Sequence, residues 1–220
     1  MVISRQQKLI LASGSPRRSA ILSKAGVVLE VVPAAIDEDA FFVGGNDLTD
    51  VVQELALAKA RAVVANREGE WVLGADTIVV LDGEVLGKPE SPDSAVSMLQ
   101  LLSGRSHEAI TGVAVVDPAG ESHTSHVSTS VIFRSLDDGE IAEYVATGLP
   151  LDKAGGYGIQ DRSFLPVSSY DGCYLNVVGL PMCATSELLE LAGFSVPSGI
   201  ACPDHLGVDS CSASDARSVQ

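Results

Sequence analysis

The sequence feature that most constrains the fold is an acidic residue inside a long apolar run. Residues Gly74–Gly87 read GADTIVVLDGEVLG, with Asp76 among isoleucine, valine and leucine. The Asp82-Gly83 pair predicts a tight turn between a buried strand and a returning strand. A buried carboxylate is costly unless a cation or hydrogen bonds offset it. Asp76 is therefore predicted to face a metal ion, a lysine or a reacting water. In a simpler alternative, Asp76 only caps a turn. The nearby Lys88 favours the interpretation in which Asp76 belongs to a functional site.

Composition predicts one globular domain, with room for two lobes. The chain has 220 residues, of which 46% are hydrophobic and 20% charged, which is enough for a full core. No apolar run approaches the roughly 18 residues of a membrane span, and the first residues lack a cleavage site of the secretory kind. We therefore expect a cytoplasmic protein without a membrane partner. The four cysteines form no C-x-x-C pair, which argues against a structural zinc site.

The formal net charge of -15 predicts that the ligand is a small molecule and not a nucleic acid. An acidic surface repels nucleic acid and anionic membranes, so nucleic acid is not an expected partner. Several of the 14 basic residues nevertheless fall in Gly/Pro-rich loops or on apolar faces, namely Arg17, Arg18, Lys59, Lys88, Lys153 and Arg162. A basic pocket in an acidic protein suits a small polyanion.

Two loops have the composition of anion-binding sites. Residues Ser13–Arg18 read SGSPRR and join a predicted first strand to a helix that starts at Pro16. The helix N-terminus favours an anion and the two arginines add donors, although the motif is neither a P-loop nor a dinucleotide fingerprint. Residues Asp152–Gln160 read DKAGGYGIQ, in which glycines allow close backbone approach and Gln160 offers the paired donor and acceptor of a base edge. A generic basic helix start and an irregular turn remain the alternatives for the two motifs.

Lys59 falls inside the apolar stripe of a helix that is predicted to start at Thr49 or Asp50. Its ammonium group either reaches the surface along the apolar stem or points into a cleft, and the sequence favours neither. The acidic loop before this helix contains Glu38. Together, the carboxylates, the cations and the glycine-containing loops predict a phosphate-hydrolysis site, in which a few carboxylates and phosphate oxygens would hold Mg²⁺.

The rest of the chain predicts alternating helices and strands. They are parallel strands at 8–12 and 27–32, a helix at 92–102 capped by Ser91, a hairpin of strands at 106–117 and 122–133, a helix begun by Asp137 and Glu140, strands at 167–170 and 173–178, and a last helix ending near Gly193. Residues 195–220 lack an apolar pattern, so we expect a domain of residues 1–194 followed by a disordered tail.

Seven motifs resemble, in the same order, those of the Maf family of nucleoside triphosphate pyrophosphatases. They are Leu11–Arg18, Ala58–Ala60, Gly74–Thr77, Gly87–Pro89, Leu102–Arg105, Asp152–Gln160 and Asn176–Pro181. The resemblance covers the chain from Leu9 to about Phe194. It implies a Maf/ITPase-like α/β fold, with a long curved mixed β-sheet flanked by helices and two lobes around a central cleft. It also implies hydrolysis of a nucleotide between its α- and β-phosphates with a divalent metal ion, either Mg, Mn or Co. One departure is Cys173, where the family more often has serine.

The resemblance also implies roles for individual residues. Asp76 matches the family's proton acceptor. Arg17, Thr77 and Gln160 match the positions that separate its subgroups, in the combination of the dTTP/UTP subgroup. The predicted site therefore consists of catalytic Asp76, Lys59 and Lys88, of substrate-binding Ser13, Arg17, Arg18, Thr77, Lys153 and Gln160, and of metal-binding Glu38 and Asp76.

The predicted function is hydrolysis of dTTP and UTP to a monophosphate and pyrophosphate, with modified pyrimidine nucleotides as an open extension. Two other functions are alternatives. A sugar-phosphate nucleotidyltransferase also begins with a strand and an Arg-containing loop, but its Gly-Gly-x-Gly-Thr-Arg type of loop is absent. A nucleotide-responsive regulator of cell division would keep its cellular effect without the Asp76 carboxylate. Assembly into a homodimer is also left open.

Overall fold

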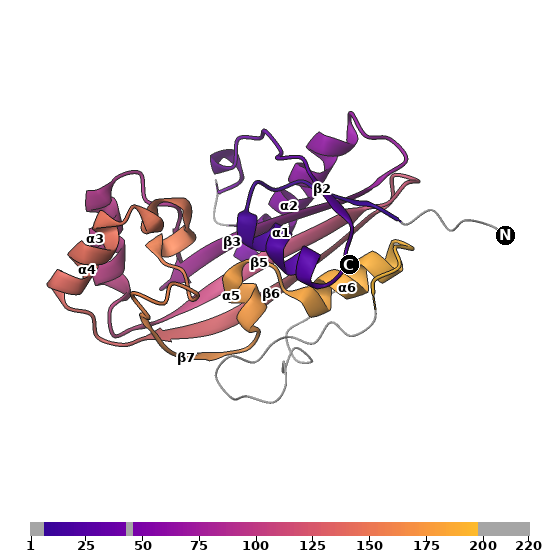
Figure 1. The fold of residues 1–220 in the computed structure, drawn as a ribbon. Coiled ribbons are helices and arrows are strands. Elements are labelled where there is room, and N and C mark those ends of the chain that lie inside the picture. The colour runs from indigo at the N-terminus through magenta and orange to yellow at the C-terminus, as the bar shows by residue number, and fades with distance from the viewer. Residues whose placement is uncertain (1–6, 43–45, 198–220) are drawn as a thin grey trace.

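The computed structural model describes residues 7–42 and 46–197. At its centre lies a seven-stranded mixed sheet in the order β2-β1-β3-β5-β6-β7, with β4 paired to β3 (Figure 1). The strands are β1 (Leu9–Leu11), β2 (Leu29–Val31), β3 (Trp71–Leu81), β4 (Glu84–Leu86), β5 (Ser106–Val116), β6 (Ser122–Phe133) and β7 (Val167–Asp171). Strand β1 pairs parallel with β2 and β3, and the other pairs are antiparallel. The expected mixed α/β sheet is therefore confirmed.

Helices flank this sheet as expected. They are α1 (Pro16–Lys24), α2 (Leu48–Val64), α3 (Pro92–Leu102), α4 (Asp138–Ala146), α5 (Tyr174–Val178) and α6 (Met182–Leu191), with short 3₁₀ turns η1 (Asp39–Phe41), η2 (Leu149–Asp152) and η3 (Ala154–Gly156). Within the described ranges, none of these helices has the length and apolar character to cross a membrane. The expected tail lies almost wholly outside the described residues, as do residues 1–6 of the expected domain.

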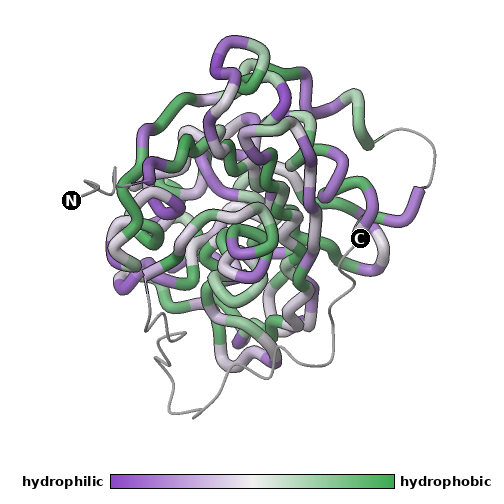
Figure 2. Tube along the Cα trace, turned by 90° about the vertical axis from the view of Figure 1, so that its right-hand side faces the viewer, coloured by the Kyte–Doolittle hydropathy of each residue, from purple (hydrophilic) through white to green (hydrophobic). Residues whose placement is uncertain are grey.

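The long strands β3, β5 and β6 carry two hydrophobic cores on one face of the sheet. One core packs Leu22 of α1 and Leu188 of α6 against the strands. The other packs Leu99 of α3 and Tyr144 of α4 against the opposite halves of the strands. These two ends of the sheet form the two lobes in Figure 1. Seen along the sheet, the trace carries many of its hydrophilic segments on the outer loops (Figure 2). The expectation of two lobes is confirmed.

Helix α2 covers the other face of the sheet at very short range. An added Cβ at Gly74 of β3 would lie 2.1 Å from the carbonyl oxygen of Ala56, and one at Gly112 of β5 would lie 2.2 Å from that of Val52. Only glycine leaves room for such a close approach of helix and strand backbones. The two glycines therefore set the distance from α2 to β3 and to β5, on which the position of Lys59 depends.

Most helix starts follow the predicted caps, but two predictions were wrong. Ser91 caps α3 and Asp137 begins α4 with a capping box, as expected, and the Ser91 cap is also part of a capping box with Ser94. Helix α2 starts earlier than predicted, because the side chain of Asp47 accepts a hydrogen bond from the backbone N–H of Thr49 at 2.9 Å. Residues 173–178 were predicted as a strand, but Tyr174–Val178 form helix α5 and Cys173 is its N-cap. The amide of Asn176 reaches the carbonyl oxygen of Ala109 (2.8 Å) and Oγ1 of Thr129 (2.9 Å), and this tertiary contact overrides the strand propensity of the segment.

His107 is buried in the second core among aromatic rings. Its side chain is 3% exposed, and its ring packs edge-on against Phe133 (4.9 Å between centroids) and Tyr157 (5.4 Å). Nε2 of His107 and the hydroxyl of Tyr157 share a hydrogen bond of 2.7 Å. Burial lowers the pKa of His107 to about 4, so the imidazole is neutral at neutral pH.

We expect His107 to make the protein less stable as the pH falls from 6.5 to about 4. In this window the unfolded chain protonates the imidazole, whereas the folded protein keeps it neutral. The unfolded state therefore binds more protons, and the free energy of unfolding decreases by up to about 3 kcal/mol as the pH falls. Urea unfolding at a series of pH values measures this decrease. The variant His107→Gln should lack this component, and identical pH dependences for both proteins would contradict the prediction.

Candidate active site

A cleft of about 1150 Å³ opens between the two lobes. All ten residues that the sequence placed in the site line this cleft, namely Ser13, Arg17, Arg18, Glu38, Lys59, Asp76, Thr77, Lys88, Lys153 and Gln160. They are spread over residues 13–160 and come from both lobes. The central cleft that the family resemblance implied is therefore present.

The cleft forms where one edge of β3 is left open. Strand β5 pairs with β3 along residues 72–80. On the other edge, β1 pairs only with residues 71–73 and β4 only with residues 79–81. Neither neighbouring strand pairs with residues 74–78 on that edge. Because successive side chains of a strand point to opposite faces, Asp76 points toward α2 and Thr77 toward α1. Polar side chains from both faces of the sheet are therefore available at this open edge.

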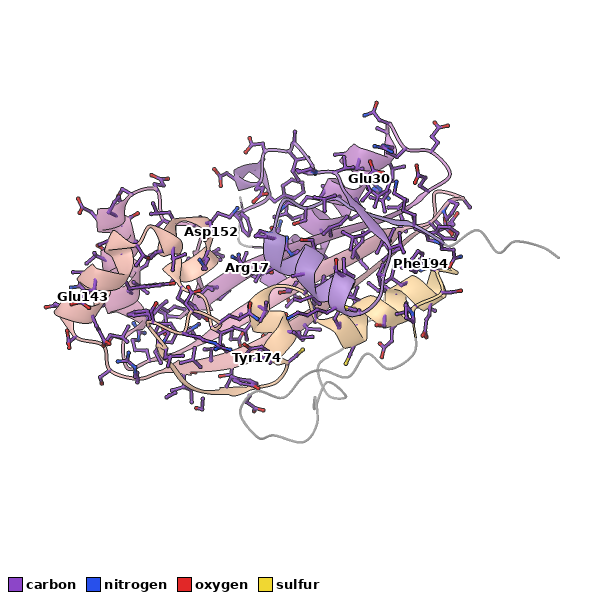
Figure 3. All side chains as sticks on the ribbon, viewed as in Figure 1. Arg17, Glu30, Glu143, Asp152, Tyr174 and Phe194 are labelled. Carbon is purple, nitrogen blue, oxygen red and sulfur yellow. The ribbon has the colours of Figure 1, made fainter. Side chains whose placement is uncertain are left out.

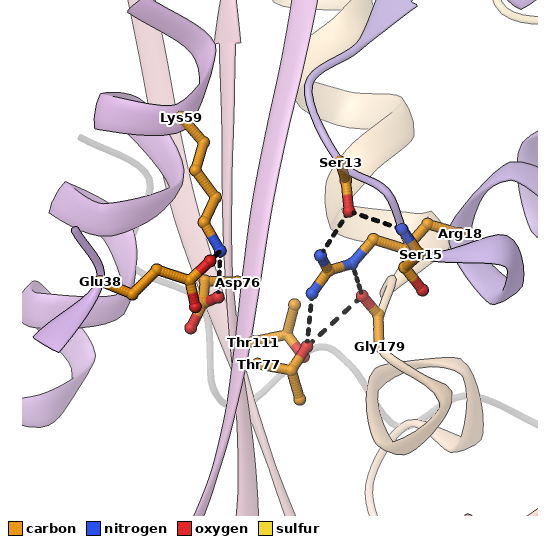
Figure 4. Close-up of polar contacts among 9 residues, drawn as sticks. All are labelled: Ser13, Ser15, Arg18, Glu38, Lys59, Asp76, Thr77, Thr111 and Gly179. Carbon is orange, nitrogen blue, oxygen red and sulfur yellow. Dashed lines mark hydrogen bonds and ion pairs between the residues drawn. The ribbon is translucent and has the colours of Figure 1, made fainter. Parts of the chain in front are cut away.

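On the α2 face, a lysine lies between two carboxylates (Figure 4). Nζ of Lys59 is 2.6 Å from Oδ1 of Asp76 and 2.7 Å from Oε1 of Glu38. The side chains of Lys59 and Asp76 are only 8% and 11% exposed, whereas that of Glu38 is 41% exposed. Lys59 therefore points into the cleft and does not reach along its stem to the surface. The ammonium group supplies the charge that offsets the buried carboxylate of Asp76.

The pKa of Glu38 reflects the same cluster. Burial alone would raise the pKa of this carboxyl. The hydrogen bond and charge of Lys59, with smaller contributions from Lys88 and Arg18, outweigh burial and hold the pKa below its usual value. Glu38 therefore stays ionised at neutral pH, and the cluster combines two carboxylates with one ammonium group.

On the α1 face, the guanidinium of Arg18 is held by three hydrogen bonds to other residues of the protein. It donates hydrogen bonds to the carbonyl oxygen of Gly179 (2.8 Å), Oγ of Ser13 (2.8 Å) and Oγ1 of Thr77 (3.0 Å), as Figure 4 shows. Oγ1 of Thr77 also bonds to that of Thr111 at 2.9 Å. Burial lowers the pKa of Arg18, while the charge of Asp76 opposes this effect. These contacts give Ser13, Arg18 and Thr77 a fixed arrangement, with one cationic group held beside the open edge of β3.

Arg17 reaches across the cleft to the other lobe. Its Nη1 lies 3.2 Å from Oδ2 of Asp152, and Figure 3 shows the two labelled side chains facing each other. Asp152 also pairs with Nζ of Lys153 at 2.8 Å. Burial would raise the pKa of Asp152, but Lys153 and then Arg17 lower it overall. Sequence reasoning placed Asp152 in a motif without a role, because nothing local shows which cation it meets.

Lys88 and Gln160 lie exposed at the cleft. The charge of Lys88 contributes to the lowered pKa of Glu38, which places it on the acidic side of the site. Burial raises the pKa of the Tyr174 hydroxyl, and a hydrogen bond from the side chain of Gln160 opposes this effect. The amide of Gln160 is therefore directed toward α5. No sequence signal identified Tyr174 or Thr111 as neighbours of the site.

The acidic residues fit a divalent ion only together with a ligand. In the part of the chain that the structure describes, no group of three or more His, Cys, Asp or Glu side chains could hold a metal ion. Glu38 and Asp76 nevertheless converge on one cationic position. Mg²⁺ is commonly held by one or two protein carboxylates plus phosphate oxygens. The two carboxylates thus suit an ion that is completed by phosphates.

Comparisons with known proteins show which sequences this chain resembles. A family model described as "Maf-like protein" matches residues 8–192. The chain is 50% identical over 192 residues to a dTTP/UTP pyrophosphatase of Moorella thermoacetica, which covers 86% of this chain and 97% of that protein. It is 45% identical over 190 residues to a dTTP/UTP pyrophosphatase of Citrifermentans bemidjiense, again with 86% and 97% covered.

Among solved structures, a nucleoside-triphosphatase / dITP/XTP pyrophosphatase from Mycobacterium abscessus is 20% identical with a TM-score of 0.40. The match covers 59% of this chain and 76% of that chain.

Proposed function

This chain belongs to the family of Maf-like proteins, and from this membership we propose that it is a nucleoside triphosphate pyrophosphatase that hydrolyses dTTP and UTP. The observation that carries the proposal is the Glu38–Lys59–Asp76 cluster, which lies in the same cleft as Arg17 and Lys153. Hydrolysis of a polyphosphate uses a carboxylate that accepts a proton from water and cations that neutralise the phosphate oxygens. The products are a nucleoside monophosphate and pyrophosphate. Because its substrates belong to the nucleotide pool of the cell, the cytoplasm is the proposed location.

In the proposed reaction, Asp76 accepts a proton from the water that attacks the α-phosphorus. Lys59 holds Oδ1 of this carboxylate at 2.6 Å, which leaves Oδ2 for the water. The bond between the α-phosphorus and the bridging oxygen then breaks, and pyrophosphate leaves. Positioning and charge stabilisation supply most of the rate enhancement in phosphoryl-transfer chemistry. Arg17, Lys88 and Lys153 are the cations proposed to neutralise the phosphate oxygens.

We assign a divalent metal ion, such as Mg²⁺, to Glu38 and Asp76. When bound, such an ion would polarise phosphate oxygens and balance the charge of the triphosphate. Ser13, Arg18 and Thr77 support the site in this proposal, because their polar groups hold the β1–α1 loop against β3.

Gln160 is proposed to read the base. A side-chain amide can donate to a pyrimidine carbonyl and accept from the ring N–H at the same time. The exposed position of Gln160 beside the cleft leaves its side chain accessible to a ligand.

The variant Gln160→Glu is expected to lower kcat/KM for dTTP and UTP much more than for purine triphosphates. Glutamate keeps the size of glutamine but loses the N–H donor, which leaves a polar group of the pyrimidine unpaired. Such a loss lowers kcat/KM by on the order of 10- to 100-fold. Steady-state kinetics with a panel of triphosphates measures it. Gln100→Glu adds the same charge on the exposed surface of α3 and serves as the control. Equal losses for all bases would assign Gln160 to the phosphates or to the loop.

The reaction itself is tested with the purified full chain and a panel of triphosphates in isotopically labelled water. The proposal requires pyrophosphate as a product, with the label in the monophosphate, because attack occurs at the α-phosphorus. Label in an inorganic phosphate would mean attack at the terminal phosphorus and would exclude the proposal. The reaction must also proceed without a sugar phosphate, which separates it from nucleotidyl transfer.

A further inference from the structure

We propose that His107 is a positioning residue for nucleotide binding. Through its contact with Tyr157, it fixes the segment of residues 153–160 against β5, and this segment presents Lys153 and Gln160 to the cleft. His107 itself does not line the cleft. The kinetic part of the inference rests on the proposed function, whereas the structural part does not.

Tyr157 is the point at which this segment is anchored. Its side chain is 6% exposed, and its ring packs edge-on against Phe133 with 4.7 Å between centroids. The hydroxyl is buried with the ring and meets Nε2 of His107 at 2.7 Å. A buried hydroxyl without a hydrogen bond is unfavourable. The bond to His107 therefore determines how deep and in which orientation the tyrosine can sit.

His107 is well suited to hold the tyrosine in place. It is the second residue of β5 and pairs with Val131 of β6, so its backbone is held in the sheet. The other ring nitrogen, Nδ1, has no hydrogen-bond partner among the residues that the structure describes. The polar interaction of this imidazole is thus directed to Tyr157, and the structure gives no second polar partner that would explain a buried histidine at this position.

A tight attachment of this segment lies N-terminal to Tyr157. The backbone N–H of Gly155 donates to the carbonyl oxygen of Gly87 at 3.0 Å, next to Lys88. An added Cβ at Gly155 would lie 3.1 Å from the side chain of Val79. Tyr157 lies two positions beyond this attachment, and Gln160 follows three positions later. Releasing the tyrosine ring would therefore loosen the residues between this attachment and the contact of Gln160 with Tyr174.

The catalytic cluster does not depend on this anchor. Glu38, Lys59 and Asp76 are held by the loop before α2, by α2 and by β3. Loss of the anchor should therefore raise KM, because it disorders the contacts to the nucleotide, while kcat stays close to its original value. A purely structural histidine would instead lower the melting temperature and leave KM unchanged in the folded protein.

The test compares four variants with the wild-type protein. His107→Leu and Tyr157→Phe each break the contact, the double variant removes both polar groups, and His107→Gln keeps a group that can hydrogen-bond to Tyr157. Two readouts are used, namely KM and kcat for dTTP, and hydrogen–deuterium exchange of the amides of residues 153–160 without nucleotide. Trp71→Phe is the matched control. It removes a hydrogen bond of 2.7 Å from Nε1 to the carbonyl oxygen of Ala192 in the other lobe.

We expect His107→Leu and Tyr157→Phe to raise KM by about tenfold, the size of one lost buried hydrogen bond, and to speed exchange in residues 153–160. The double variant should match the single ones, because both groups act through one contact. His107→Gln should restore most of the affinity, and Trp71→Phe should change neither readout.

Unchanged KM or unchanged exchange in the contact-breaking variants would overturn the inference, as would equal effects of His107→Gln and His107→Leu. If His107→Leu fails to fold, Tyr157→Phe and His107→Gln still decide the question. A wild-type protein that cleaves no triphosphate would refute the proposed function. In that case the exchange measurement alone would decide whether His107 anchors the segment.

Discussion

Asp76→Asn is expected to lower kcat for dTTP by at least about 100-fold, because the amide cannot accept the proton of the attacking water. Asparagine keeps the shape of the side chain, so substrate binding should change less than turnover. Steady-state kinetics at saturating dTTP measures this loss. Asp82→Asn is the matched control, because it makes the same change at the exposed turn between β3 and β4. A variant that keeps more than about a tenth of kcat would show that Asp76 is not the proton acceptor.

The same variant should also be moderately less stable than the wild type. Removing one partner of a buried ion pair costs roughly 3–5 kcal/mol, because the other charge is left without compensation. In Asp76→Asn the ammonium of Lys59 keeps its contact with Glu38, so the cost should fall below that range. Chemical denaturation of both proteins gives the difference.

Lys59→Met should reduce both activity and stability, with the larger loss of stability of the two variants. Methionine fills the apolar stem of the lysine but leaves the Asp76 carboxylate, 11% exposed, without its ammonium partner. A cost of roughly 3–5 kcal/mol lowers the melting temperature by on the order of 10 °C in a domain of this size. We also expect kcat/KM to fall by about 100-fold, because the proton acceptor loses its orientation.

Lys8→Met provides the control for Lys59→Met. It removes a lysine from an exposed pair with Glu30 at the far end of the sheet, and exposed pairs contribute little to stability. Its melting temperature and turnover should therefore stay close to those of the wild type. If Lys59→Met turned over dTTP at the wild-type rate, Lys59 would have no part in the reaction. A stability equal to that of Asp76→Asn would mean that another cation compensates Asp76.

Much of the fold was predictable because local patterns and the final structure agree. The Asp82-Gly83 turn, the helix caps at Ser91 and Asp137 and the hairpin of β5 and β6 are local signals, and each appears as expected. The site residues were predictable as a set because they lie in motifs at the ends of strands and helices. The cleft brings that set together, while the role of each residue stays a prediction.

What the sequence could not give depends on contacts between distant segments. The orientation of Lys59 was open because it depends on how close α2 approaches β3, and this distance is set at Gly74 and Gly112. Residues 173–178 were expected as a strand because their valines favour one, yet Asn176 binds groups of β5 and β6 that lie far away in sequence. The partner of Arg17, Asp152, belongs to the other lobe for the same reason.

The long strands run through both lobes, and this continuity determines how the protein unfolds. Leu73 and Val79 belong to one strand, β3, but to different cores, and Val115 and Ala109 divide in the same way on β5. Unfolding of either core would disrupt strands on which the other core is also packed. The lobes are therefore not independent folding units that are joined by a hinge, and the molecule should lose its structure in a single cooperative step. Because the edge of β3 that β1 and β4 leave unpaired lines the cleft, we expect a ligand to reach it without a separation of the lobes.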